Sequence, residues 1–212
     1  MSDCCTPEGY RRIFSEKNAR GDAKGYRKNG LDATSKRIYD LLKARGVDGA
    51  TVLEVGGGIG AIQIELLKAG AAKVVSIELT PTYEEVATQL LREAGLEDRV
   101  ERRVMDFANA GDAVEAADVV VLNRVICCYP DMPKLAGAAA DHTKGVLVMS
   151  FPREWTSVGL GMANFGMWAL RQGFHIFVHR HEQIAETAAQ HGLKRTTDAP
   201  GFIWQVASFA RV

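Results

Sequence analysis

Short apolar runs alternate with helical patterns along most of this chain. Five runs are rich in valine, leucine and isoleucine: TVLEV (51–55), KVVSIEL (73–79), RVERRVMDF (99–107), DVVVL (118–122) and GVLVMSF (145–151). Strands that are buried on both faces have this composition. Apolar residues at helical spacing follow the first two runs, and we expect a helix between each pair of strands. The alternation predicts a parallel α/β sheet covered by helices on both faces.

The two ends of the chain have different patterns. Residues 1–33 carry many charges and glycines, so we expect loop or loosely packed helix that serves as a lid. Residues 34–212 then form one α/β domain. Late in it, helices are expected at 157–172 and 181–192, and residues 193–212 predict two strands around a Pro-Gly turn. With its last strand antiparallel, the expected fold is a doubly wound, mostly parallel, seven-stranded Rossmann-like sheet.

Composition fits an ordinary globular protein. Of the 212 residues, 47% are hydrophobic and 25% charged, which suits one domain with a full-sized core. Lysine plus arginine and aspartate plus glutamate both number 26, so there is no basic excess for binding nucleic acid. No apolar run approaches the ~20 residues that span a bilayer. The first residues lack signal-peptide features, and we expect a cytoplasmic protein with reduced cysteines.

A glycine loop, EVGGGIG at 54–60, follows the first predicted strand. Glycine permits the abrupt turn into a helix and lets a ligand approach the backbone. The helix that follows offers free N–H groups and a partial positive charge. Such a loop can hold a pyrophosphate or a carboxylate, so the glycines alone leave the ligand open.

Two cofactor classes fit this loop. A dinucleotide fingerprint, G-x-G-x-x-A, can be laid on residues 56–61, and Glu78 at the end of the next strand suits ribose hydroxyls in either case. Glu54, however, would attract a cationic ligand and repel a pyrophosphate. Asp106 after the third strand suits the exocyclic amine of an adenine. These acids favour a cationic, adenine-containing cofactor over a nicotinamide dinucleotide.

The combination resembles class I S-adenosylmethionine-dependent methyltransferases. It consists of Glu-x-Gly-x-Gly-x-Gly at 54–60, the acid Glu78 and the pair Asp106–Phe107, and the resemblance covers roughly residues 34–212. It implies that S-adenosylmethionine is the cofactor. The loop residues that would hold its methionine end are Glu54, Gly56, Gly58 and Gly60.

The same resemblance assigns the adenosine end. Glu78 would bind the ribose hydroxyls and Asp106 the adenine amine, with Phe107 or Leu79 packing on the ring. The metabolic substrate does not follow from these positions.

Within this class, the layout is most similar to magnesium-protoporphyrin O-methyltransferases. The similar pieces are YRKNGLD at 26–32, YP at 129–130 and FVH at 177–179. That family usually carries aspartate where this chain has Asn123. We therefore carry over architecture and cofactor and not the porphyrin substrate.

The exit of the fourth strand, NRVICCYP at 123–130, should face the transferring methyl group, because ligands of open α/β sheets bind at the carboxyl ends of the strands. Tyr129 could bind the acceptor or relay a proton, or simply pack as an aromatic. Asn123 could bind the cofactor amine or the acceptor through its amide, or simply cap the strand. Arg124 could pair with an acidic substrate group or stay solvated. Cys127 and Cys128 are expected as polarizable lining of the pocket.

Three histidines, His175, His179 and His181, recur at even spacing and would share one face of a strand. A metal site there is not expected, because only Glu182 offers a carboxylate nearby. His179 is the candidate general base for a hydroxyl acceptor. Tyr26 in the predicted lid is the candidate substrate contact from the N-terminal region.

The adjacent cysteines allow other chemistries that we consider less favoured. A four-thiolate metal site would need Cys4 and Cys5 to fold onto Cys127 and Cys128, and adjacent pairs lack the C-x₂-C spacing of structural zinc. Vicinal thiols also suit soft thiophiles such as trivalent arsenic.

The favoured function is O- or N-methylation of a small molecule by in-line displacement at a sulfonium methyl. A relative that binds the cofactor without transferring methyl, such as a cyclase or a regulatory partner, remains open. So does an NAD(P)-dependent oxidoreductase. The pattern determines neither the methyl acceptor nor the oligomeric state.

Overall fold

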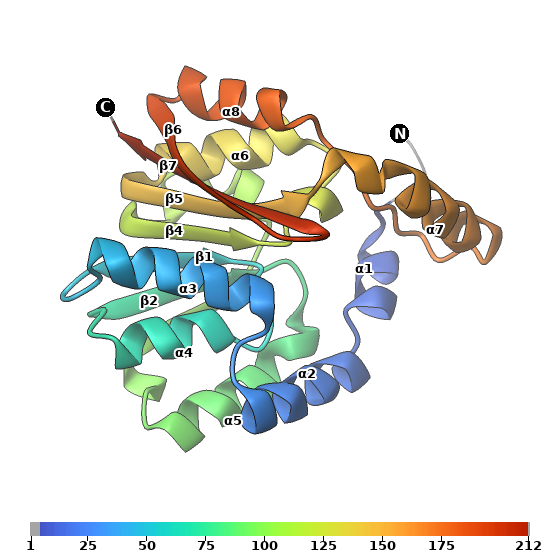
Figure 1. Cartoon of the computed structure of the whole chain (residues 1–212). Coiled ribbons are helices and arrows are strands. Elements are labelled where there is room, and N and C mark those ends of the chain that lie inside the picture. The colour runs from blue at the N-terminus through green and yellow to red at the C-terminus, as the bar shows by residue number, and fades with distance from the viewer. Residues whose placement is uncertain (1–4, 212) are drawn as a thin grey trace.

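Seven strands form one sheet in the order β3-β2-β1-β4-β5-β7-β6 (Figure 1). The computed structural model describes residues 5–211. The strands are β1 Thr51–Val55, β2 Lys73–Glu78, β3 Val100–Val104, β4 Ala117–Asn123, β5 Thr143–Pro152, β6 Leu193–Pro200 and β7 Trp204–Arg211. The first five pair in parallel, and β7 runs antiparallel to both of its neighbours. The predicted mostly parallel sheet with an antiparallel last strand is confirmed.

Helices cover both faces of the sheet, as Figure 1 shows. They are α1 Pro7–Ile13, α2 Glu16–Asn29, α3 Ala33–Arg45, α4 Ala61–Lys68, α5 Glu84–Ala94, α6 Met132–Asp141, α7 Ser157–Ala169 and α8 His181–Gln190. Helices α3, α4 and α5 enclose one hydrophobic core with the sheet, and α6 and α8 enclose the other. The projecting α7 belongs to neither core.

The central strand β4 explains why the strands read as continuous apolar runs. Val119 and Val121 point into the core under α3 and α4, whereas Val120 and Leu122 point into the core under α6 and α8. Successive side chains of a strand alternate between its two faces, so a strand covered on both sides needs apolar residues at every position.

Two sequence expectations about the connections were wrong. No α-helix separates β3 from β4; two short 3-10 turns, Phe107–Asn109 and Gly111–Ala113, connect them instead. The segment is short, and Gly111 has a positive φ of 51° that interrupts any helix. The histidine-rich segment 172–180 contains no strand, so its evenly spaced histidines do not share a strand face.

The N-terminal region is helical and packs on the α/β body. Tyr26 of α2 donates a hydrogen bond of 2.6 Å to Glu65 of α4, and Arg27 pairs with Glu93 of α5 at 2.8 Å. Tyr10 and Phe14 of α1 pack edge-on against Phe174 in the segment after α7. The predicted division of the chain at residue 33 stays a prediction.

Within residues 5–211, no helix combines the length and the apolarity needed to cross a bilayer.

Candidate functional site

A cavity of about 550 Å³ opens at the carboxyl ends of β1, β2, β3 and β4. Its far wall comes from the N-terminal helices α1 and α2, which supply Tyr10, Phe14 and Tyr26. The chain leaves β1 toward β2 on one side and reaches β4 on the other, so the cavity lies at the switch point of the sheet. The fold therefore places a ligand site where the glycine loop predicted one.

The glycine loop between β1 and α4 requires glycine at four positions, among them Gly58, whose φ is 60°. Gly56 and Gly60 have φ values of 65° and 77°, which residues with a Cβ rarely adopt. A Cβ on Gly60 would lie 1.9 Å from Gln63 Nε2, and one on Gly57 would lie 2.5 Å from Glu54 Oε2. Gly56 to Gly58 line the cavity, so the backbone itself is presented to a ligand there. Gly60 supports the turn and is not part of the cavity wall.

Glu54 lies directly beneath this loop. Its side chain is 1% exposed, and within residues 5–211 neither carboxylate oxygen has a hydrogen-bond partner. Burial raises the pKa of Glu54 to about 7. Arg102 and the nearby backbone N–H of Gln63 lower this pKa by a smaller amount. That N–H does not reach hydrogen-bond geometry. A buried, unpartnered carboxyl costs free energy unless a ligand compensates it. Glu54 is not itself part of the cavity wall and lies behind Gly57, so its charge would favour a cation in the cavity from across the loop.

Gln63 of α4 is a second buried polar side chain without a partner within residues 5–211, and it lies next to Gly60 of the glycine loop. It is fully buried, and neither amide atom has a partner among the described residues. Sequence reasoning missed Gln63 because a single glutamine within an apolar helix face gives no motif.

Glu78 closes the loop from the end of β2. Its Oε1 accepts a hydrogen bond of 2.6 Å from Gly58 N. Burial raises the pKa of Glu78 to about 8, against the lowering influence of Arg102 and this N–H, and Glu54 raises it further. Leu79, which follows, is partly exposed and lines the cavity.

Arg102 of β3 offsets the two buried acids, and sequence reasoning missed it. Its guanidinium donates to Glu84 at 2.8 Å and 3.0 Å and to the carbonyl of Gly58 at 3.2 Å. It thereby connects the loop to α5. Arg102 is one of three arginines in the strand run RVERRV, and nothing in the run distinguishes it from a surface charge.

Asp106 and Tyr129 both line the cavity and contact one another. The Tyr129 hydroxyl lies 3.1 Å from each carboxylate oxygen of Asp106. Burial and then the Asp106 charge raise the pKa of Tyr129 to about 12. Asp106 also accepts from the N–H of Ala108 and the side chain of Asn109. The sequence predicted Asp106 at the adenine and Tyr129 at the methyl acceptor, whereas the structure brings the two side chains into contact.

Phe107, the residue expected to pack on an adenine ring, follows Asp106. Its side chain is buried and it contributes to the same part of the cavity wall. Tyr83 from the turn before α5 lines the cavity near Gly58 and donates to Asp22 of α2 at 3.0 Å. Sequence reasoning did not single out Tyr83, because the element after β2 was considered only for its helix cap.

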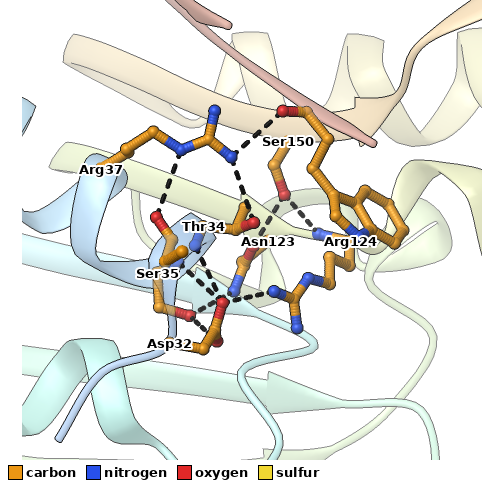
Figure 2. A network of polar contacts seen from close by, with 9 residues as sticks. Asp32, Thr34, Ser35, Arg37, Asn123, Arg124 and Ser150 are labelled. Atoms are coloured by element: carbon orange, nitrogen blue, oxygen red, sulfur yellow. Dashed lines mark hydrogen bonds and ion pairs between the residues drawn. The ribbon is translucent and has the colours of Figure 1, made fainter. Parts of the chain in front are cut away.

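A polar network connects α3 to the exit of β4, as Figure 2 shows. The side chain of Asn123 donates to Ser35 Oγ at 3.1 Å and accepts from Ser150 Oγ at 2.7 Å. Ser35 in turn donates to Asp32 at 2.7 Å. The Asn123 amide, expected to face cofactor or acceptor, thus holds strands β4 and β5 against the start of α3.

Arg124 follows Asn123 in a left-handed conformation with φ of 62°. Its N–H donates to Ser150, and its guanidinium pairs with Asp32 and lies over the Trp204 ring at 5.3 Å from the centroid (Figure 2). A non-glycine residue at positive φ is held there by its surroundings. Arg124 is part of the cavity wall, where it presents a half-exposed cation already paired with an acid.

Asp32 sits at the centre of the network and caps α3. It accepts hydrogen bonds from the N–H groups of Thr34 and Ser35. Burial would raise the pKa of Asp32, but the Ser35 hydroxyl, the Arg124 charge and the two N–H groups together hold it below its ordinary value. Arg37 extends the network through Thr34 to the carbonyls of β6 and β7.

The two cysteines after β4 have different surroundings. Cys128 lines the cavity, whereas Cys127 is buried behind it and is not part of the wall. Their sulfurs lie 3.5 Å apart, and the hydrogen bond with Cys127, burial and the Cys127 charge raise the pKa of the Cys128 thiol. Tyr10 of α1 donates to the Cys128 carbonyl.

Metal binding has no assembled ligand set in the part of the chain that the structure describes. No group of three or more histidine, cysteine, aspartate or glutamate side chains is arranged there to hold an ion. The four-thiolate alternative involves Cys4, which lies outside the described residues.

His179, the expected general base, lies behind the 3-10 turn Ile126–Cys128. Burial lowers its pKa, although the Ile126 backbone opposes this, and its Nε2 has no partner within residues 5–211. The segment that carries it is fixed by a 2.7 Å bond from Phe177 N to the Cys127 carbonyl. His179 is not part of the cavity wall, and its catalytic role stays a prediction.

Comparison with known proteins gives one family match and one curated relative. The profile of the methyltransferase domain family matches residues 26–197. Ribosomal protein L11 methyltransferase from Enterobacter sp. (strain 638) is 31% identical over 94 residues, which make up 44% of this chain and 31% of that protein. The chain thus aligns with less than a third of that relative's length.

Solved structures share the fold at low identity. Magnesium protoporphyrin IX methyltransferase from Synechocystis PCC 6803 with bound SAH has a TM-score of 0.75 at 18% identity, covering 95% of this chain and 98% of that chain. The [4+2]-cyclase SpnF has a TM-score of 0.63 at 15% identity, covering 82% of this chain and 80% of that chain. These similarities establish the fold. They do not establish the reaction, which has to be inferred from the residues of the site.

Proposed function

The chain belongs to the methyltransferase domain family, and from this premise we propose that it transfers the methyl group of S-adenosylmethionine to a small-molecule acceptor. The observation that carries the proposal is Glu54, a buried carboxyl without a partner within residues 5–211, directly beneath a glycine loop that borders the cavity. S-adenosylmethionine carries an ammonium and a sulfonium, so its charge complements this carboxyl, whereas a pyrophosphate would be repelled.

The residues present fit this cofactor from end to end. Gly56 to Gly58 offer backbone at the cavity surface for the methionine end, and Glu78 at the end of β2 is positioned for ribose hydroxyls. Asp106, steadied by Tyr129, and Phe107 form the pocket for the adenine. When bound, S-adenosylmethionine supplies an electrophilic methyl on sulfur, and the protein contributes alignment and exclusion of water.

The acceptor side is formed by Tyr26, Arg124 and Cys128. An acidic group on the acceptor could displace Asp32 as the partner of Arg124, since that ion pair is half exposed. A hydroxyl acceptor must lose its proton, and the base predicted from the sequence is His179, which burial keeps neutral but which lies behind the cavity wall. His179→Ala should lower turnover and leave cofactor affinity unchanged; equal turnover would remove His179 from the mechanism.

A mass-shift screen tests the proposed reaction. The purified protein is incubated with S-adenosylmethionine and pools of candidate metabolites, and products are sought at +14 Da together with S-adenosylhomocysteine. Glu54→Gln serves as the impaired variant, and Glu101→Gln, an exposed acid on β3, serves as the matched control. A product formed by wild type and control, and reduced with Glu54→Gln, supports the proposal.

A second candidate is a cofactor-binding protein that does not transfer methyl, which the fold similarity to a cyclase favours. It predicts tight binding of S-adenosylmethionine without formation of S-adenosylhomocysteine from any acceptor pool.

A further inference from the structure

Helix α7 and the turn between β6 and β7 carry a large exposed apolar surface, which we call the α7 patch. On the helix, Val158, Met162, Phe165 and Trp168 are 76%, 73%, 68% and 73% exposed. Leu170 follows the helix, Trp155 precedes it, and Trp155 contacts Phe202 of the turn with ring centroids 5.2 Å apart. Single exposed apolar residues are ordinary, but a contiguous patch of this size marks an interaction surface.

The outward face of α7 is apolar, unlike that of a helix on a water-facing surface, and its inward face holds Asn164 between the half-buried Leu160 and Met167. Asn164, its amide residue, faces the protein and exchanges hydrogen bonds of 2.7 Å and 2.8 Å with the backbone of Ile176. Val158, Met162 and Phe165 recur at i, i+4 and i+7 and face outward. Surface helices place these residues the other way round. The surroundings that suit this helix are therefore less polar than water.

The charged residues around α7 and the position of this helix in the fold indicate which surroundings suit it. No charged residue occurs from Trp155 to Leu170, and arginines Arg153 and Arg171 lie immediately outside. Glu154, the acid next to this stretch, is engaged by the N–H of His181 at 2.8 Å. Figure 1 shows α7 projecting from the body beside α1. Tryptophan near the ends of an apolar segment and basic residues beside it are typical of the interface between a bilayer and water.

We infer that the α7 patch docks on an anionic phospholipid surface, with the helix lying in the plane of the interface. Arg12 of α1 donates to the Arg171 carbonyl and pairs with Glu8 at 3.7 Å, so the C-terminal end of the patch holds two arginines and one acid and has a net positive charge. Such a cationic rim attracts anionic headgroups. In a two-fold contact between copies of the chain, the patch would meet itself, arginines included. The lipid surface fits the charges better than a second copy does.

Vesicle flotation tests the inference on the full chain. Wild type is mixed with vesicles of phosphatidylcholine alone or with one quarter phosphatidylglycerol, and the bound fraction gives a partition coefficient. We expect binding that is stronger to the anionic vesicles and weaker at high salt. Met162→Gln/Phe165→Gln should reduce partitioning by about tenfold or more, and the matched control Met162→Leu/Phe165→Leu should retain it. Arg171→Gln should cost about fivefold on anionic vesicles only.

Two measurements on the wild type make the result decisive even if a variant misfolds. Brominated phosphatidylcholine should quench the fluorescence of Trp155 and Trp168, because both lie at the inserted face. Sedimentation equilibrium without vesicles should show no self-association through the patch. Absence of vesicle binding overturns the inference. So does a dimer that Met162→Gln/Phe165→Gln dissolves, which would assign the patch to a second copy. None of these outcomes depends on methyl transfer.

Discussion

At the scale of single residues, the proposed function gives the ionisation of Glu54 a role in ligand binding. Burial keeps its pKa near 7 in the free protein, and a cationic ligand favours the charged form and lowers that pKa. Binding must then release a proton near neutral pH. Affinity for S-adenosylmethionine should rise as pH increases from about 6 to about 8, because the competing proton is removed.

Glu54→Gln removes this titration. We expect its affinity to fall by about tenfold at pH 8, the size of a lost hydrogen bond to a charged group, and to vary less with pH. Calorimetry in buffers of different ionisation enthalpy measures the released proton directly. The exposed Glu101→Gln should behave as wild type, and a pH-independent wild-type affinity would contradict the role given to Glu54.

The bond between Tyr129 and Asp106 predicts a binding role for the tyrosine. Tyr129→Phe removes the donor to Asp106 and should weaken S-adenosylmethionine binding severalfold, with turnover at saturating cofactor unchanged. Separate measurement of cofactor Kd and of kcat distinguishes this outcome from the proton relay that the sequence suggested. A fall in kcat with an unchanged cofactor Kd would contradict the binding role and favour the proton relay.

Gly60 is where the loop is most restricted. Gly60→Ala places a Cβ 1.9 Å from Gln63 Nε2 at a φ of 77°, and a strained site of this kind costs about 1–3 kcal/mol. The thermal midpoint should fall. Gly159→Ala in α7, where a Cβ meets nothing within 4 Å, is the control and should leave the midpoint unchanged or slightly raised. Equal midpoints in both variants would show that Gly60 is not under this constraint.

At the scale of elements, the cap of α3 connects the N-terminal region to β4. Asp32 caps the helix and pairs with Arg124, and its pKa is lowered below 3.8. A lowered carboxyl pKa adds stability above the unfolded pKa, and this stability is lost as pH falls through the folded pKa. Asn caps a helix as well as Asp does, so Asp32→Asn chiefly removes the charge that faces Arg124 and the helix N-terminus. It should destabilise the protein by about 1 kcal/mol at pH 7, and the difference should shrink below about pH 4.

Urea unfolding at several pH values measures that difference. The control is Asp40→Asn on the same helix, whose exposed pair with Lys36 at 2.8 Å contributes little. If the two variants lose equal stability at pH 7, the network in Figure 2 contributes no more to the free energy of unfolding than an exposed ion pair does.

At the scale of the whole molecule, the layered sheet and the glycine loop could be predicted from sequence, because both follow from local rules. Apolar runs identify buried strands, and only glycine fits the loop after β1. The connection from β3 to β4 could not be predicted, since periodicity does not reveal that two 3-10 turns are enough to span it. The pairing of Tyr129 with Asp106 and the network around Asp32 join positions far apart in the chain, so no local pattern contains them.

The central claim is that the cavity binds S-adenosylmethionine. Calorimetric titration of the full chain with S-adenosylhomocysteine and, separately, with NAD⁺ tests it most directly. The structure predicts one site per chain for S-adenosylhomocysteine and no measurable heat with NAD⁺, because a pyrophosphate would approach the Glu54 carboxyl. Binding of NAD⁺ without binding of S-adenosylhomocysteine would contradict the claim.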